Sequence, residues 1–227
     1  MPTPKTTGWV RLGLLMLPVY GILTLIGTLT HQPDPNTDFE AYARYISTTS
    51  YLISHLGVSI FGTALAILGF IALAAYLVNG RAGRWALFAM VTGVAGNSLI
   101  LTIFGFSTFA SPAIGQAYLE GQHQAVEINQ AILGLPLIVT ALTGGLLYTA
   151  STILFGIAIW RSRTLPRWAG ILYAPAGFLL SILGLVVGQS QTVGTALLIV
   201  ATAWISGSAL RRPSAESVGL GAQPRVH

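Results

Sequence analysis

Cysteine is missing from this chain and charged residues are rare. The absence of cysteine from its 227 residues excludes disulfides, Cys-ligated zinc or iron–sulfur sites and a thiol nucleophile. Charged residues make up 7% of the chain, whereas an average soluble domain carries about 25%. Hydrophobic residues reach 53% and the mean hydropathy is +0.73. This composition predicts an integral membrane protein, and it excludes a soluble globular protein, a disordered chain and, despite the net charge of +5, a nucleic-acid-binding domain.

The few charged residues divide the chain into long neutral stretches. A membrane-spanning helix needs about 20 apolar residues, so the first four stretches hold one helix each. The last stretch, from Trp168 to Leu210, has room for two helices around the polar turn 188–192. The sequence thus predicts an all-α bundle of six transmembrane helices, at Trp9–Leu29, Tyr51–Val78, Trp85–Phe106, Ala131–Trp160, Trp168–Val187 and Thr192–Leu210.

The charges also predict the orientation of the bundle. Every basic residue except Arg44 falls at one end of these helices: Lys5, Arg11, Arg81, Arg84, Arg161, Arg163, Arg167, Arg211, Arg212 and Arg225. The loops at the other end carry Asp34, Asp38, Glu40, Glu120 and Glu127. Because basic loops stay inside, we expect both termini in the cytoplasm. The first helix is too long and lacks the cleavage site of a signal peptide, so we expect it to be retained.

Two outer loops are long enough to hold short helices. Residues 31–50 contain Thr37 and Asp38, either of which is a candidate cap for a helix reaching Tyr45. Residues 107–130 contain Ser111-Pro112, which favours a helix start. The second of these helices is expected to be amphipathic and to lie on the membrane surface. We predict a six-helix domain over residues 1–212 and a disordered cytoplasmic tail over residues 213–227, which are small and polar.

The loop from Arg161 to Gly170 contains the segment Leu165-Pro166-Arg167-Trp168 between long helices rich in small residues. This basic Leu-Pro-Arg-Trp loop resembles one found in uncharacterised bacterial multi-helix membrane proteins, whose helix count and loop arrangement are similar over most of the chain. The resemblance implies a multi-pass protein of the bacterial plasma (inner) membrane. It supplies no catalytic residue and no function.

The sequence shows neither the mid-membrane charges of ion-coupled transporters nor the common enzyme motifs. Apart from Arg11 at the start of the first span, none of the predicted spans contains Asp, Glu, Lys or Arg, whereas ion-coupled transporters usually hold such a group at mid-membrane. The chain also lacks the nucleotide-binding P-loop, the His-Glu-x-x-His zinc motif and the Gly-x-Ser-x-Gly nucleophile motif. We therefore expect no cofactor, and we favour a non-enzymatic protein over an enzyme.

A small set of polar residues within the spans remains as a candidate site. His55 heads a face of small residues in the second helix, Asn97 lies near the middle of the third, and Tyr148 and Ser151 share a face of the fourth. One interpretation, which we favour, is close helix packing, with Asn97 bonded to Tyr148, Ser151 or Thr63. The other is a ligand-binding cavity that opens outward between these three helices.

The outer face carries one possible metal site. Glu120, His123 and Glu127 are spaced so that they would share a helical face, and Glu-x-x-His is a ligand spacing of carboxylate-bridged metal bundles. His31, Asp34, Asp38 and Glu40 in the first outer loop are candidates to complete such a site. The alternative, which we favour, is a solvated acidic surface without a metal.

These observations leave three functional classes open. The favoured class is an accessory or interaction subunit, or a binder of a small apolar or amphipathic molecule in an outward-facing cleft. The second is an uncoupled transporter or facilitator with Asn97 and Tyr148 on its path, and the third is a membrane enzyme with a metal on its acidic outer face. The expected partners are the lipid bilayer and a membrane protein or a second copy of the chain, with no nucleic acid.

Overall fold

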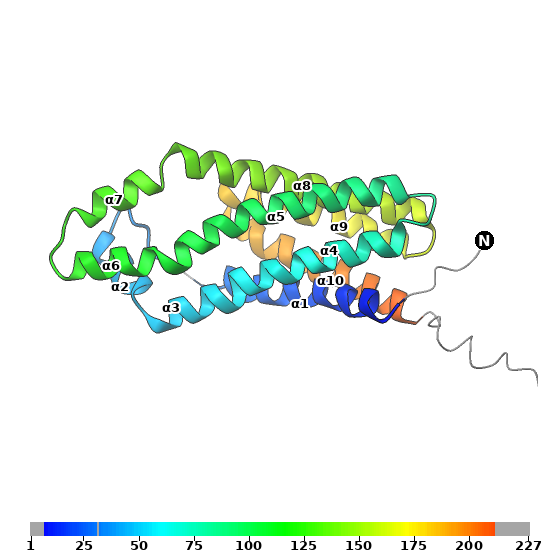
Figure 1. Cartoon of the computed structure of the whole chain (residues 1–227), viewed down its shortest axis with the longest axis horizontal. Helices are drawn as coiled ribbons and strands as arrows, with labels where there is room; N and C mark the ends of the chain where they lie inside the picture. Colours follow the sequence, from blue (N-terminus) through cyan, green and yellow to red (C-terminus); the bar gives the residue numbers. More distant parts are fainter. Residues whose placement is uncertain (1–6, 31, 212–227) are drawn as a thin grey trace, which may run out of the picture.

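The predicted six-helix membrane bundle is confirmed by the structure. The computed structural model describes residues 7–30 and 32–211, and this part of the chain is helical, with no strand. Six of its helical segments are long and apolar enough to cross a membrane, and Figure 1 shows them running along the long axis of the molecule. Their bounds are Gly8–Thr28, Thr49–Leu77, Gly83–Leu119, Leu135–Ser162, Arg167–Leu185 and Gly188–Leu210. Residues 213–227, the expected tail, lie outside the described residues.

Several of these six segments are composites of smaller elements. The simple spans are α1 (Gly8–Thr28), α8 (Leu135–Ser162) and α10 (Gly188–Leu210). The second span joins α3 (Thr49–Ser54), the π-helix η1 (His55–Ile60) and α4 (Phe61–Leu77); the third joins α5 (Gly83–Phe109) and α6 (Ser111–Leu119); the fifth joins α9 (Arg167–Leu180) and the 3₁₀ turn η2 (Leu183–Leu185). Two short helices, α2 (Phe39–Ile46) and α7 (Ala125–Ile132), lie outside the spans.

The predicted position of the turn between the last two spans is wrong. We predicted the polar turn at residues 188–192, but these residues form the first turn of α10, and the chain turns over residues 181–187 instead. The Ser190 hydroxyl donates to the Val187 carbonyl at 2.7 Å, and the Gln191 side chain donates to the Gly184 carbonyl at 3.2 Å. These polar side chains lie in the first turn of α10 and satisfy carbonyl groups of the turn that precedes it.

The fourth span also begins later than expected. Its predicted start at Ala131 falls inside α7, and α8 begins at Leu135, after an extended Gly134. Pro136 stands in the first turn of α8, where its missing N–H costs no hydrogen bond. The proline therefore separates a short helix outside the spans from the spanning helix.

The six spans form a closed ring. Each packs against its two neighbours in the order α1, α4, α5, α8, α9, α10 and back to α1. Side chains of four of these helices fill the centre of the ring: Leu17, Phe70, Tyr148, Phe155 and Tyr173. The Phe70 and Phe155 rings lie 5.5 Å apart, and the Phe155 and Tyr173 rings lie 6.3 Å apart. The middle of the bundle is therefore a packed aromatic core.

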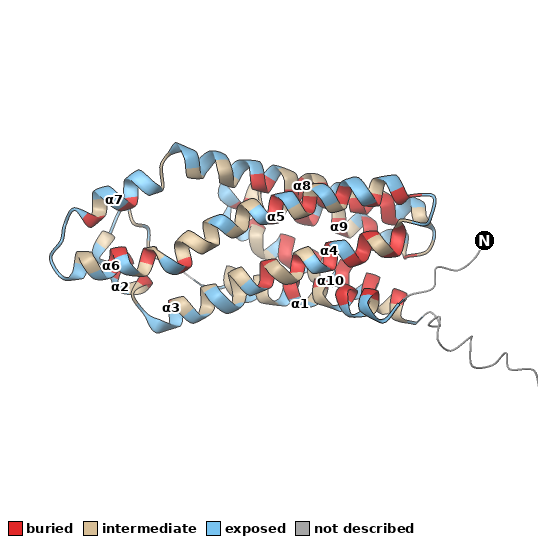
Figure 2. Ribbon diagram, in the orientation of Figure 1, coloured by how far each residue is buried: buried red, intermediate tan, exposed pale blue. Residues whose placement is uncertain are grey.

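This core occupies only one half of the bundle. We call the end that carries the α4–α5 and α8–α9 loops the basic end, and the end that carries α2, α6 and α7 the cap end. Figure 2 shows buried residues gathered in the half toward the basic end. In the other half no residue is buried over 22–28 of α1, 55–60 of η1, 98–107 of α5 or 135–143 of α8. These four helical segments lack a shared core.

Candidate functional site

Asn97 is buried in α5 and makes no hydrogen bond to α8. Its side chain is 1% exposed, and Nδ2 donates to the Gly93 carbonyl of its own helix at 2.8 Å. The expected hydroxyl partners are occupied elsewhere: Ser151 donates to the Ala89 carbonyl at 2.6 Å, and Thr63 donates to the Ser59 carbonyl at 2.6 Å. The predicted bond from Asn97 across the helices is therefore wrong, because a nearer carbonyl one turn back takes the amide.

Ser151, by contrast, does connect two helices. It belongs to α8 and donates to Ala89 of α5, and both residues are buried. A Cβ placed on Gly93 would lie 2.4 Å from the Ser151 oxygen and 2.3 Å from the Phe70 ring, so the glycine makes room for both side chains. Such a hydroxyl-to-carbonyl bond beside a glycine is typical of helix association in lipid.

Tyr148 contacts a residue that the sequence analysis did not single out. The Tyr20 hydroxyl of α1 donates to the Tyr148 hydroxyl of α8 at 3.3 Å, across the middle of the ring. Tyr173 of α9 is also fully buried, and its hydroxyl has no hydrogen-bond partner among the described residues. Its ring packs on Phe155, 6.3 Å away, so the side chain serves the aromatic core. Sequence position alone gives no sign that Tyr20 meets Tyr148.

Glycines bring the helix backbones into direct contact around the ring. A Cβ on Gly96 of α5 would lie 2.8 Å from the Gly144 carbonyl oxygen and 2.8 Å from the Tyr148 amide nitrogen of α8. A Cβ on Gly156 of α8 would lie 2.7 Å from the Gly170 carbonyl oxygen of α9. These approaches leave no space for a side chain, as the packing interpretation predicts.

His55 lies apart from the other three candidate residues. It begins the π-helix η1, is half-buried, and its Nδ1 lies 3.1 Å from the Tyr51 carbonyl oxygen. Its ring packs on the Tyr51 ring with a centroid distance of 3.9 Å. The π-helix itself packs against α1 and α5 and holds no buried residue. π-Helical turns inside α-helices are frequent at functional sites, and no residue pattern in the sequence indicates this one.

Glycines near His55 lie in open space. A Cβ on Gly57 of η1 or on Gly105 of α5 would meet no atom within 4 Å, unlike one on Gly93 or Gly96. α1 does pack closely on η1, since a Cβ on Gly27 would lie 3.0 Å from the Val58 side chain. The looser packing of the cap half is therefore seen in its unburied segments and in the open space beside Gly105 of α5. Of the candidate residues, the structure places His55 there, and it places Asn97, Tyr148 and Ser151 in the packed half.

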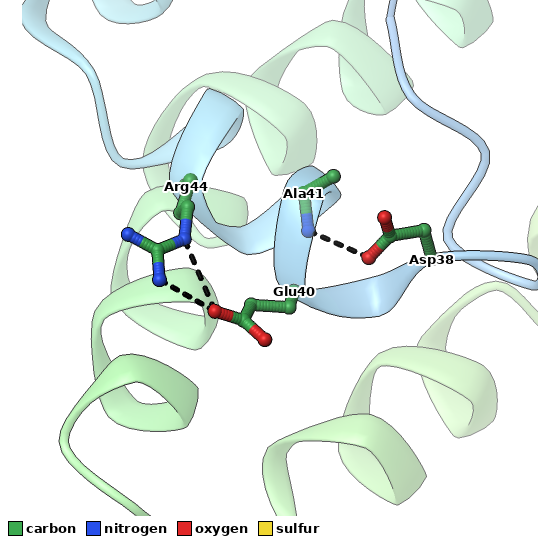
Figure 3. Close-up of polar contacts among 4 residues, drawn as sticks. All are labelled: Asp38, Glu40, Ala41 and Arg44. Atoms are coloured by element: carbon green, nitrogen blue, oxygen red, sulfur yellow. Dashed lines mark hydrogen bonds and ion pairs between the residues drawn. The ribbon is translucent and has the colours of Figure 1, made fainter.

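The cap covers this loosely packed half. Of the two candidate caps, Thr37 and Asp38, it is Asp38 that caps α2, with its carboxylate accepting from the Ala41 amide at 2.9 Å (Figure 3). Arg44 pairs with Glu40 on the exposed side of the same helix. The opposite side of α2 packs on α6, which begins at the predicted Ser111. Tyr42 is buried there, and this burial raises the pKa of its phenol.

The predicted grouping of Glu120, His123 and Glu127 on one helical face is wrong. α6 ends at Leu119, Gly121 adopts a positive φ of 91°, and α7 begins only at Ala125, so a turn separates the three exposed residues. His123 instead packs edge-on against Tyr118 at 5.4 Å. Within residues 7–30 and 32–211, no three His, Asp or Glu side chains lie close enough together to hold a metal ion. His31, the remaining candidate ligand, lies outside the described residues.

Comparison with known proteins finds no relative of this chain. No family model, curated protein or solved structure matches this chain. The fold defines the class as a multi-pass membrane bundle, and any more specific function must be argued from the geometry above.

Proposed function

We propose that this chain is a non-enzymatic protein of the bacterial plasma membrane that binds a small apolar or amphipathic molecule between η1, α5 and α8. The observation that carries the proposal is the contrast between the two halves of the ring. One half is closed by glycine contacts and aromatic rings, while four spans in the other half hold no buried residue beneath the folded cap. Interiors of folded proteins are normally close-packed, so the half that lacks a shared core is the part of the bundle that we expect an occupant to complete.

The orientation completes this proposal. The described basic end carries Arg81, Arg84, Arg161, Arg163 and Arg167, and its described part has no Asp or Glu. The positive-inside rule then directs this end to the cytoplasm and the cap to the outside. The ligand site lies in the outer leaflet under the cap, with His55 as its polar contact. The resemblance of the Leu-Pro-Arg-Trp loop to bacterial membrane proteins supports the bacterial inner membrane.

The same geometry argues against the transporter and the enzyme. A facilitator needs a continuous polar path, but Tyr148, Phe155 and Phe70 fill the centre of the ring with rings 5.5–6.0 Å apart. A metal enzyme needs ligands brought together, and Glu120, His123 and Glu127 are separated by a turn.

An accessory subunit remains the second candidate because α7 and the start of α8 carry exposed apolar side chains. Ile128 is 48% exposed, and Leu135, one residue into α8, is 72% exposed. These side chains suit either a protein partner or the membrane surface. A membrane protein partner or a second copy of the chain would be seen as a larger particle in native mass spectrometry of the purified protein.

The absence of cysteine allows a direct test of the ligand site. Ile103→Cys in α5 and Thr140→Cys in α8 place single thiols in the cap half, and Ser151→Cys places one in the packed half. We expect a membrane-impermeant maleimide to modify the first two thiols from the cap side, dodecanoate to protect them, and Ser151→Cys to stay unmodified.

Other outcomes of this labelling would decide against the proposal. Unreactive thiols at both 103 and 140 would show that the cap half is closed. Equal modification of all three variants from both sides of the membrane would indicate a through-path and favour the facilitator.

A further inference from the structure

A second feature, at the opposite end of the molecule, is independent of the proposed ligand site. The α8–α9 turn and the neighbouring α4–α5 turn enclose a hollow of about 250 Å³. Its lining is Arg81, Trp160, Arg161, Arg163 and Arg167. Four guanidinium groups around one hollow, with no carboxylate in the described part of this end, make a strongly anion-attracting surface.

Two of these arginines have a defined local arrangement at the α8–α9 turn. Arg163 ends α8 with a positive φ of 55°, a left-handed conformation that normally favours glycine. The Arg167 guanidinium lies over the Trp160 ring at 5.5 Å, a cation–π contact that steadies the side chain. Arg167 is thus held beside the hollow by a ring contact, and all four arginines around the hollow are exposed to solvent.

A second hollow, of about 350 Å³, continues from the first along the outside of the bundle. It shares Trp160 and Arg161 with the arginine hollow, and the remainder of its lining is apolar: Ile153, Gly156 and Ile157 from α8, and Gly170, Ile171 and Ala174 from α9. The groove exists because Gly156 and Gly170 meet backbone to backbone, so no side chain fills the space between the helices. Exposed Ile153 and Ile171 line its sides, as expected of a surface that faces lipid chains.

We infer that this pair of hollows binds one anionic phospholipid, with the phosphate between the arginines and an acyl chain in the α8–α9 groove. The two hollows are complementary to such a lipid, because a cluster of cations is joined to an apolar groove through Trp160 and Arg161. Arg recognises phosphate with paired N–H donors, and Trp sits at the level of the headgroups. Basic pockets between membrane helices on the cytoplasmic side are suited to anionic headgroups.

The test is lipid retention by the full chain in native mass spectrometry, with phosphatidylglycerol and phosphatidylcholine of equal chain length as probes. The Arg161→Gln/Arg167→Gln variant removes two groups from the hollow. Its control, Arg84→Gln/Arg211→Gln, removes the same charge from exposed positions that line neither hollow. Arg84 also lies over a tryptophan, Trp85, at 5.5 Å, so the control also loses an arginine–tryptophan contact.

We expect the unmodified chain to retain phosphatidylglycerol over phosphatidylcholine. At about fivefold per arginine near a charged membrane surface, the double variant should bind phosphatidylglycerol about 25-fold more weakly, with little change in the control. Ala174→Phe, which places a ring in the groove, should remove the advantage of long-chain over six-carbon phosphatidylglycerol. Thermal unfolding of each variant verifies its fold, and the two arginine variants decide the question if Ala174→Phe does not fold.

Three results would overturn the inference. Equal loss in both arginine variants would mean that only surface charge matters. Equal retention of phosphatidylcholine would remove the anionic specificity. Displacement of the lipid by millimolar inorganic phosphate, with equal stabilisation of the chain by phosphate alone, would identify a site for a free anion.

Discussion

Gly96→Ala is the substitution whose effect the structure defines most closely. The new methyl carbon would lie 2.8 Å from the Gly144 carbonyl oxygen and 2.8 Å from the Tyr148 amide nitrogen. Both atoms belong to the backbone of α8, so no side chain can rotate away, and the two helices must separate. Overpacking of this kind costs about 1–3 kcal/mol.

Gly105→Ala is the matched control, because it makes the same chemical change in the same helix. A Cβ on Gly105 meets no atom within 4 Å, and alanine is the better helix former by about 1 kcal/mol. We therefore expect Gly105→Ala to be neutral or stabilising and Gly96→Ala to be destabilising.

Thermal unfolding of the two variants in the same mild detergent measures the difference. With soluble chains of this length as a guide, about 1–3 kcal/mol corresponds to a Tm lower by about 2–12 °C. Equal Tm values for Gly96→Ala and Gly105→Ala would refute the close approach of α5 and α8, and with it the closed half of the ring.

Three further predictions address orientation, polar packing and the cap. Reporter fusions after Arg84 and after Arg163 should be cytoplasmic and a fusion at Gln116 external, and a cytoplasmic Gln116 would overturn the proposed orientation. Asn97→Leu should change the free energy of unfolding by less than about 0.6 kcal/mol, because its amide bonds to its own helix; a larger loss in detergent unfolding would argue for a bond between helices. Burial raises the pKa of Tyr42, so the stability that it contributes is complete below the unfolded pKa of about 10 and is lost as pH rises through the higher folded pKa. Alkaline titration of the chain, followed by tyrosine absorbance, should therefore show one late-ionising phenol fewer in Tyr42→Phe than in the unmodified chain.

The spans follow from the sequence because lipid permits little else. A long run without charge must form a helix to satisfy its backbone, so the first span was predicted at Trp9–Leu29 and lies at Gly8–Thr28. The cap of α2 was narrowed to Thr37 or Asp38 for a similar reason, because a capping side chain acts only on an amide of the next turn; the structure selects Asp38. Features that depend on one or two neighbouring residues can therefore be predicted from a short stretch of the sequence.

Features that depend on how helices rotate and approach were not predictable in the same way. Asn97 and Thr63 were expected to bond between helices, yet both donate to carbonyls four residues earlier in the chain. A polar residue in a span therefore need not mark a hydrogen bond between two helices. The π-helix at His55–Ile60 depends on packing against α1 and α5, which no local pattern of residues reports.

The uneven burial along the ring also has a mechanical consequence. Backbone contacts such as Gly96 with Gly144 make the basic half resistant to deformation, whereas the cap half, with unburied segments around η1, has fewer contacts to break when it changes width. A change in bilayer thickness or lateral pressure is absorbed where a helical bundle is most compliant. In this protein the compliant region is the rim beneath the cap, so stretching the membrane should widen that rim while the base keeps its diameter.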